Sequence, residues 1–124
     1  MRKNINGIFI FVCVLAFATG CRSIESPQDE QVFKRYYPDG ILKSIWVTKS
    51  GKLNGIKRIY TEDGTLEKAT EYNDDVIDGM NNIYYADGAI WKKETYQNGR
   101  LLNRKEFDEE GILTNEEKLA DKEI

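Results

Sequence analysis

The fold of this chain is decided by three copies of one short motif: Tyr36-Tyr37-Pro38-Asp39-Gly40, Tyr60-Thr61-Glu62-Asp63-Gly64 and Tyr84-Tyr85-Ala86-Asp87-Gly88. The leading tyrosines are spaced 24 residues apart. Repetition at a fixed period of this length is typical of proteins built from stacked supersecondary units. We therefore expect one structural unit that is copied along the chain.

A second segment recurs with the same period, at residues 50–55, 74–79 and 98–103, and a shortened fourth unit begins at Phe107. Aligning the units produces three apolar columns. Because the side chains of a column should have the same environment in each unit, we expect the units to stack. Stacking would bury apolar surface that a single unit could not bury alone. The columns are Leu42/Leu66/Ile90/Leu113, Leu53/Ile77/Leu101 and Ile59/Ile83/Phe107, with Tyr36/Tyr60/Tyr84 beside the last.

The punctuation of each unit predicts hairpins. Asp-Gly and Asn-Gly pairs are strong turn signals because glycine accepts positive φ. Between the turns lie segments of strand length, such as 66–72 and 76–84, that are rich in Tyr, Thr, Ile and Val. We expect an all-β fold, an elongated single-layer antiparallel sheet of successive β-hairpins with apolar residues near the turns. Its repeat positions are Tyr36, Gly40, Gly55, Tyr60, Gly64, Gly79, Tyr84, Gly88 and Gly111.

The pattern Tyr-x-x-Asp-Gly, a strand, then Asn/Ser-Gly-x-Leu-x-Gly resembles the MORN repeat, and more closely its bacterial variant in antitoxin-like proteins. The resemblance covers residues 36 to about 113. It departs from the pattern at Asp75, which replaces a turn glycine, and at Asn103, which replaces a closing glycine. Both residue types tolerate left-handed backbone better than most. The resemblance implies an interaction or scaffold module with no catalytic centre.

The N-terminal residues have the layout of a secretory signal. Arg2 and Lys3 give a positive start, and an apolar run of eleven residues extends from Ile8 to Ala18. Such a run suits a signal peptide, whereas a transmembrane helix needs about 20 apolar residues. We therefore expect residues 1–20 to be a cleaved signal peptide.

The segment Ala18-Thr19-Gly20-Cys21 resembles the lipobox that signal peptidase II recognises in bacterial lipoproteins. Small residues before Cys21 let the backbone enter a narrow protease groove, and the cysteine thiol takes the lipid. Ala18 stands where a larger aliphatic residue is usual. The alternative is ordinary cleavage that leaves Cys21 as a free or buried thiol. Lipidation is favoured because Cys13 falls in the removed segment, and acylation accounts for the one cysteine that remains.

The expected mature chain has three parts: a polar tether at 21–31 that contains Pro27, the repeats at 32–114 and a charged tail at 115–124. Loss of Arg2 and Lys3 leaves 16 basic against 21 acidic residues, a net charge of −5. This balance argues against a nucleic-acid partner. Arg22, which stands where aspartate would retain a lipoprotein, favours the outer membrane over the inner membrane by the sorting rule of enteric bacteria.

The aromatic residues are the candidate binding positions. The Tyr36/Tyr60/Tyr84 column suits packing between repeats. Trp46 and Trp91 have no tryptophan counterparts in the other units, so each is a candidate for contact with a protein partner or, alternatively, for capping or core packing. The full candidate set is Trp46, Trp91, Tyr72, Tyr85 and Tyr96.

Catalytic and metal sites are not expected. The chain contains no histidine, which removes the commonest general base and metal ligand. The acidic residues Asp74, Asp75 and Asp78 do not match a calcium-loop spacing, so a polar turn is the better interpretation. We expect no enzyme activity, cofactor or metal, but a lipid-anchored envelope protein that binds a protein partner. The alternatives are an antitoxin or immunity lipoprotein and a lipid- or glycan-binding module, the latter at Trp91-Lys92-Lys93.

Overall fold

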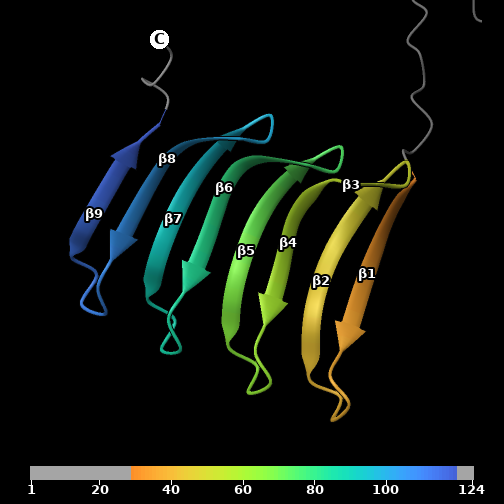
Figure 1. Ribbon diagram of the computed structural model, residues 1–124. Coiled ribbons are helices and arrows are strands. Elements are labelled where there is room, and N and C mark those ends of the chain that lie inside the picture. The colour runs from red at the N-terminus through yellow and green to blue at the C-terminus, as the bar shows by residue number, and fades with distance from the viewer. Residues whose placement is uncertain (1–28, 120–124) are drawn as a thin grey trace, which may run out of the picture.

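The computed structural model describes residues 29–119. Within them the chain forms one antiparallel sheet whose strands lie side by side in sequence order (Figure 1). Eight strands form the path β1-β2-β4-β5-β6-β7-β8-β9, and the short strand β3 pairs with β2. The strands are β1 Glu30–Tyr36, β2 Leu42–Lys49, β3 Lys52–Leu53, β4 Gly55–Tyr60, β5 Leu66–Asn73, β6 Val76–Tyr84, β7 Ile90–Gln97, β8 Arg100–Phe107 and β9 Leu113–Lys118.

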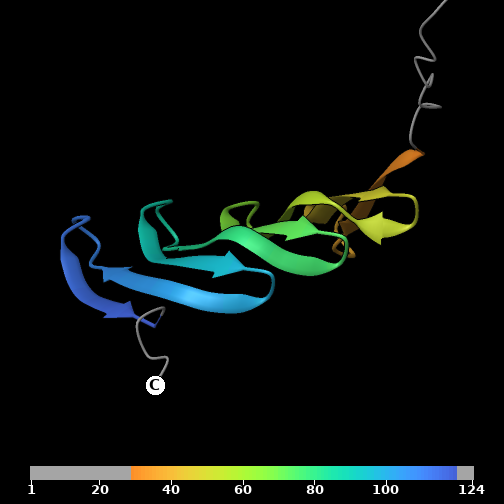
Figure 2. The same cartoon turned by 90° about the horizontal axis from the view of Figure 1, so that it is seen from above.

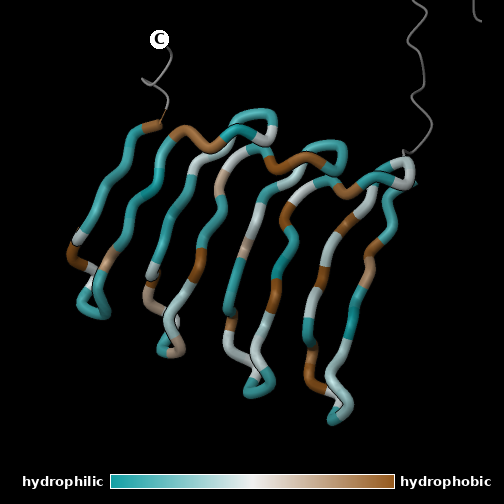
Figure 3. Tube along the Cα trace, in the orientation of Figure 1, coloured by the Kyte–Doolittle hydropathy of each residue, from teal (hydrophilic) through white to brown (hydrophobic). Residues whose placement is uncertain are grey.

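The sheet is a single twisted layer, which is clear when it is seen from above (Figure 2). The substantial contacts between elements all join strands that are neighbours in the sheet. No apolar side chain of residues 29–119 is fully buried. Hydrophobic residues lie near the turns and also part-way along β2, β4 and β6 (Figure 3). The predicted fold class, a thin antiparallel sheet of successive hairpins, is confirmed.

The longer turns form where the Tyr-x-x-Asp-Gly motifs lie. In the first, Gly40 N–H donates to the Tyr37 carbonyl and has a φ of +92°. The carboxylate of Asp39 accepts the Ile41 N–H at 3.0 Å, so the aspartate closes the turn that the glycine allows. The second and third turns repeat this bond. In the fourth, Asp108 accepts the Ile112 N–H at 2.7 Å from another position in the turn.

The shorter turns have two central residues with positive φ, as type I′ hairpins require. The pairs are Ser50-Gly51 at +52° and +80°, Asp74-Asp75 at +48° and +70°, and Asn98-Gly99 at +48° and +81°. Asp75, which aligns with the turn glycines Gly51 and Gly99, therefore has the positive φ that those glycines have. Asn103 does not have a positive φ, unlike Gly55 and Gly79 at the equivalent positions of the other units. Strand β8 therefore passes through this position without the left-handed backbone that those glycines adopt.

Successive turns are connected by Tyr37 and Tyr85, which directly follow Tyr36 and Tyr84 of the expected tyrosine column. The hydroxyl of Tyr37 donates to the Tyr60 carbonyl at 2.8 Å, and that of Tyr85 donates to the Phe107 carbonyl at 2.9 Å. Each bond reaches from one turn to the next unit. Tyr60 and Tyr84 are half-buried within the stack, whereas Tyr36, in the edge strand β1, is 56% exposed.

The sheet extends past the limits expected for the repeats, residues 32–114. Strand β1 starts at Glu30 and β9 ends at Lys118, because the polar residues at both ends pair with an adjacent strand. The expected signal peptide, Cys21 and most of the tether lie outside the described residues. Among residues 29–119 there is no helix with the length and apolarity that a membrane crossing needs.

Candidate functional site

One face of the sheet carries a row of side chains that crosses six strands. Directly opposed residues of an antiparallel pair point to the same face. The opposed residues here are Lys57, Thr70, Asn81, Glu94, Arg104 and Glu117, on β4 to β9. We call their side of the sheet the ladder face. The four buried polar residues of the described chain include Thr70, Asn81 and Glu94.

Hydrogen bonds connect the middle of this row. The Thr70 hydroxyl donates to Asn81 Oδ1 at 2.7 Å, and Asn81 Nδ2 donates to Glu94 Oε2 at 2.7 Å. Arg104 Nε donates to Glu94 Oε1 at 2.8 Å, and Arg104 also lies 3.7 Å from the carboxylate of Glu117. We call Thr70, Asn81, Glu94 and Arg104 the polar ladder. It links four strands through side chains in addition to their backbone pairing.

Glu94 is the centre of the polar ladder and is only 6% exposed. Burial alone would raise the pKa of its carboxyl, but hydrogen bonds from Asn81, Arg104 and Tyr96 outweigh that effect and lower the pKa below its ordinary value. Glu94 is therefore an ionised carboxylate near neutral pH, with its charge balanced by Arg104. A carboxylate in this state is a poor general acid, and its lone pairs are used by structural donors.

A cluster of aromatic and cationic residues lies on the same face beside the polar ladder. The rings of Phe33 and Trp46 stack at 5.5 Å with an interplanar angle of 11°. Arg35 lies 5.3 Å and Lys57 5.5 Å from the centre of the Trp46 ring. We call Phe33, Arg35, Trp46 and Lys57 the Trp46 cluster. It draws on β1, β2 and β4, and Phe33 within it is 39% exposed.

Trp91 belongs to a separate cluster at the turn end of β7. It is 41% exposed, its ring lies 6.2 Å from that of Tyr85, and Lys92 Nζ lies 4.6 Å from its ring centre. The same ammonium group is 3.0 Å from Glu106 Oε1. Trp91 therefore presents an open aromatic surface next to a cation whose charge is already shared with a carboxylate.

The remaining two candidate residues lie on the ladder face near the short turns. Tyr72 is opposite Gly55 and Ile77, and Tyr96 is opposite Gly79 and Leu101. Both are half-buried. The hydroxyl of Tyr96 donates to Glu94 Oε2 at 3.2 Å. The five aromatic candidates thus divide into three places, and Tyr96 is tied to the polar ladder.

Sequence reasoning did not identify the partners of Trp46, nor the polar ladder. Phe33 and Arg35 lie on β1, Trp46 on β2 and Lys57 on β4. Turns therefore separate Trp46 from its partners in the sequence, and no local spacing connects them. A signal was available for the polar ladder. Trp46, Thr70 and Glu94 occupy the same position of the repeat. Counting outward from the two-residue turns would nevertheless have placed Gly55, Gly79 and Asn103 opposite them, because register shifts within the hairpins bring Lys57, Asn81 and Arg104 there instead.

The acidic residues of the second short turn accept hydrogen bonds from the preceding hairpin. Asp75 Oδ1 accepts the Leu53 N–H at 2.7 Å, and Asp74 Oδ1 accepts from Asn54 Nδ2 at 3.0 Å. These bonds tie one hairpin to the next. Within residues 29–119 there is no group of three or more His, Cys, Asp or Glu side chains placed to hold a metal ion.

Comparison with known proteins supports the repeat assignment. The family model described as a MORN repeat variant matches residues 32–50 and 78–98. The matched segments cover most of the β1–β2 and β6–β7 hairpins, each centred on a Tyr-x-x-Asp-Gly turn. These two segments are therefore similar to MORN-variant repeats. No curated protein matches the chain.

A solved structure resembles the chain at low similarity. It is a chain in the crystal structure of accessory secretory protein 1, 2 and 3 in Streptococcus pneumoniae, with 20% sequence identity and a TM-score of 0.47. The match covers 90% of the present chain and 21% of the other. The present chain thus spans about a fifth of that protein's length, and the likeness is too distant to inform function.

Proposed function

We propose that this chain, which carries MORN-variant repeats, is a non-catalytic protein-binding module of the bacterial cell envelope. In this proposal Cys21 carries the lipid that holds the chain to a membrane, with the outer membrane favoured by Arg22. The ladder face binds a protein partner, and the Trp46 cluster provides the central contact.

The observation that supports this proposal is the stacking of Phe33 on Trp46 between the cations Arg35 and Lys57. Tryptophan and arginine are enriched among the residues that dominate protein interfaces. Stacking holds the two rings in place before binding, so little conformational entropy is lost when a partner docks. The two cations favour a partner surface with carboxylates around an apolar centre.

Site-specific photocrosslinking in cells tests the face as well as the binding. A photoreactive residue at Lys57, on the ladder face, should form a crosslink to a protein partner. The matched control is Arg58, its exposed neighbour on the opposite face. Trp46→Ala should abolish the Lys57 crosslink while circular dichroism shows an intact sheet. Equal crosslinking from positions 57 and 58, or an unchanged crosslink in the Trp46 variant, would show that the ladder face is not the docking surface.

The membrane anchor has its own test. Labelled palmitate should enter the wild-type protein and be absent from a Cys21→Ser variant, which should leave the membrane fraction. A Cys21→Ser variant that stays in the membrane to the wild-type extent would refute lipid anchoring. An antitoxin or immunity role is a special case of the same proposal, in which the crosslinked partner is a toxin.

A second candidate function is binding of a lipid headgroup or glycan at Trp91. It is favoured by the exposure of Trp91 and the 4.6 Å contact with Lys92. Vesicle flotation and glycan binding, each compared between wild type and Trp91→Ala, test it. Binding that does not depend on Trp91 would exclude this site.

A further inference from the structure

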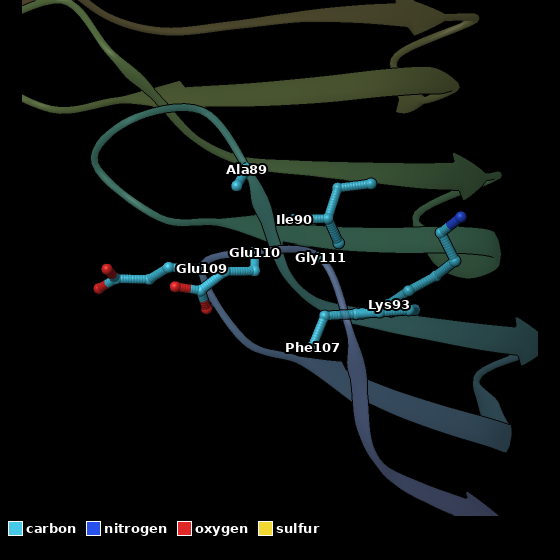
Figure 4. Close-up of a pocket in the computed structure, with 7 residues that line it drawn as sticks. All are labelled: Ala89, Ile90, Lys93, Phe107, Glu109, Glu110 and Gly111. Carbon is cyan, nitrogen blue, oxygen red and sulfur yellow. The ribbon is translucent and has the colours of Figure 1, made fainter.

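The junctions between successive repeats share one arrangement. Across the β5–β6 junction, Leu66 and Tyr84 line one hollow. Across the β7–β8 junction, Ile90 and Phe107 line another, beside a turn whose Glu109 carboxylate extends away from it (Figure 4). Both junctions therefore bring the leucine-column residue of one hairpin together with the aromatic residue that ends the first strand of the next hairpin.

At the two edges of the sheet this pairing is split. Leu113 of β9 has the leucine-column position and is 45% exposed, while Tyr36 of β1 has the aromatic position and is 56% exposed. Their counterparts Ile90 and Tyr84, inside the sheet, are half-buried. Within residues 29–119 no strand pairs with the outer side of β1 or of β9. One edge thus presents the first half of a junction, and the other presents the second half.

Strand direction allows the two halves to meet. The strands alternate in direction along the path, so β1 runs parallel to β6 and β9 runs parallel to β5 (Figure 1). A second copy placed beside β9, in the same orientation, would offer its β1 as an antiparallel neighbour. No rotation of the copy is needed, because this repeats the step from β5 to β6.

The internal repeat also gives the register of such a contact. In the β5–β6 pair, Lys68, Ala69 and Thr70 are opposite Ile83, Asn82 and Asn81. Placing Leu113 at the position of Leu66, and Tyr36 at that of Tyr84, transfers this register to β9 and β1 of two copies. The transferred pairs are Asn115 with Arg35, Glu116 with Lys34 and Glu117 with Phe33.

The charges of the two edges are complementary in this register. Strand β9 carries Glu116 and Glu117, and β1 carries Lys34 and Arg35. Glu116 already lies 3.5 Å from Lys105 on one side, and the transferred register places Lys34 of a second copy on its other side. In a symmetric pair of β1 edges centred on Lys34, or of β9 edges centred on Glu116, these residues would instead face their own like-charged copies, which disfavours those registers.

We propose that copies of this chain associate head to tail, with β9 of one copy pairing antiparallel with β1 of the next in the transferred register. The occupant of the open edge is therefore a second copy of the chain. Such a heterologous contact does not close on itself and generates linear arrays. One strand pair is a small interface, so association should depend on concentration, which confinement to a surface would raise. Strand β1 also supplies Phe33 and Arg35 to the Trp46 cluster, so the pair of Lys34 and Glu116, on the opposite face of the sheet, tests the edge contact separately from the proposed docking surface.

Disulfide crosslinking of the full chain in cells tests the register. Directly opposed residues of antiparallel strands lie within disulfide range, at Cα distances of about 4.5–5.5 Å. A chain with both Lys34→Cys and Glu116→Cys should give a ladder of dimers, trimers and larger species on non-reducing gels. Arg35→Cys with Asn115→Cys should do the same. The matched control, Lys34→Cys with Lys118→Cys, is out of register by two residues, about 7–8 Å, and should give no ladder.

Charge reversal separates loss of association from loss of folding. In the Arg35→Cys/Asn115→Cys chain, adding Lys34→Glu should reduce the crosslinked fraction about fivefold, as expected for like charges in direct opposition. Adding Glu116→Lys to that variant should restore the ladder. Absence of a ladder from both in-register pairs, equal crosslinking of the control, or dimers from a chain with Lys34→Cys alone would each overturn the proposal.

Discussion

Replacing Glu94 by glutamine tests whether the polar ladder stabilises the sheet. The substitution keeps the size and shape of the side chain and removes its charge. Glu94 uses one carboxylate oxygen to accept from Asn81 and Tyr96, and the other to accept from Arg104. A glutamine amide has one acceptor oxygen and one N–H₂ group. Whichever way it turns, one of the former donors must face another donor.

The expected cost follows from that mismatch. Hydrogen bonds to charged groups contribute about 1.5–3 kcal/mol each. Glu94→Gln should lose one such bond, weaken the others and leave an unsatisfied donor next to a residue that is 6% exposed. We expect the free energy of unfolding to fall by about 2 kcal/mol, which corresponds to a Tm about 10 °C lower for a domain of this size.

Urea unfolding followed by circular dichroism measures this loss. Glu106→Gln is the matched control, because Glu106 also pairs with a cation, Lys92, but its side chain is 29% exposed and water can replace the lost contact. The control should unfold at a urea concentration closer to that of the wild type. If Glu94→Gln were as stable as the control, burial would not increase the contribution of the polar ladder's hydrogen bonds to the free energy of unfolding, and the reasoning would be refuted.

The same pair of proteins has a defined pH dependence. The pKa of Glu94 is lowered in the folded state from its ordinary value of 4.5, so the folded protein favours the ionised carboxylate. The stability that Glu94 contributes is therefore present above about pH 4.5 and is lost as the pH falls through the lowered folded-state pKa. The stability difference between wild type and Glu94→Gln should shrink across that range. A difference that stays constant with pH would contradict the assignment.

Two further substitutions test the turns and the junctions. Gly79→Ala should lower the free energy of unfolding, measured in urea, by about 1–2 kcal/mol more than Gly55→Ala does. Both glycines have positive φ, but a Cβ at Gly79 would clash with Glu71 and displace its carboxylate from the hydrogen bond with Met80 N–H. Equal losses in the two variants would mean that Glu71 moves away freely. Tyr85→Phe should lower the Tm by removing the hydrogen bond to the Phe107 carbonyl, and an unchanged Tm would show that stacked turns do not depend on it.

The recurring turn motifs of the sequence were sufficient to predict the antiparallel sheet. The aspartate and the glycine of the motif recur for a backbone reason, since the turn needs a positive φ at Gly40 and an acceptor at Asp39. Even the departure at Asp75 followed the rule, with a φ of +70°. Turn chemistry is local, so one sequence is enough to recognise it.

The functional face was less accessible to the same reasoning. Trp46, Thr70 and Glu94 share a repeat position but differ in chemistry, so comparison of units makes them look unrelated. Their complementarity exists only across strands, where Thr70 meets Asn81 and Trp46 meets Lys57. Aligning the units compares residues that occupy the same repeat position, whereas the contacts join residues at different repeat positions on neighbouring strands. The aromatic candidates were therefore found one by one, without the cations and rings that surround them.

The arrangement of contacts has a mechanical consequence. Because each strand touches its immediate neighbours and little else, tension applied across the strand order would load one junction at a time. The outermost hairpins, which have a neighbour on one side only, would detach first, and the remainder would keep their structure. A sheet of this kind should yield to pulling in small successive steps and not in one rupture. It should also tolerate the deletion of a whole hairpin, since the flanking units could rejoin in the same register.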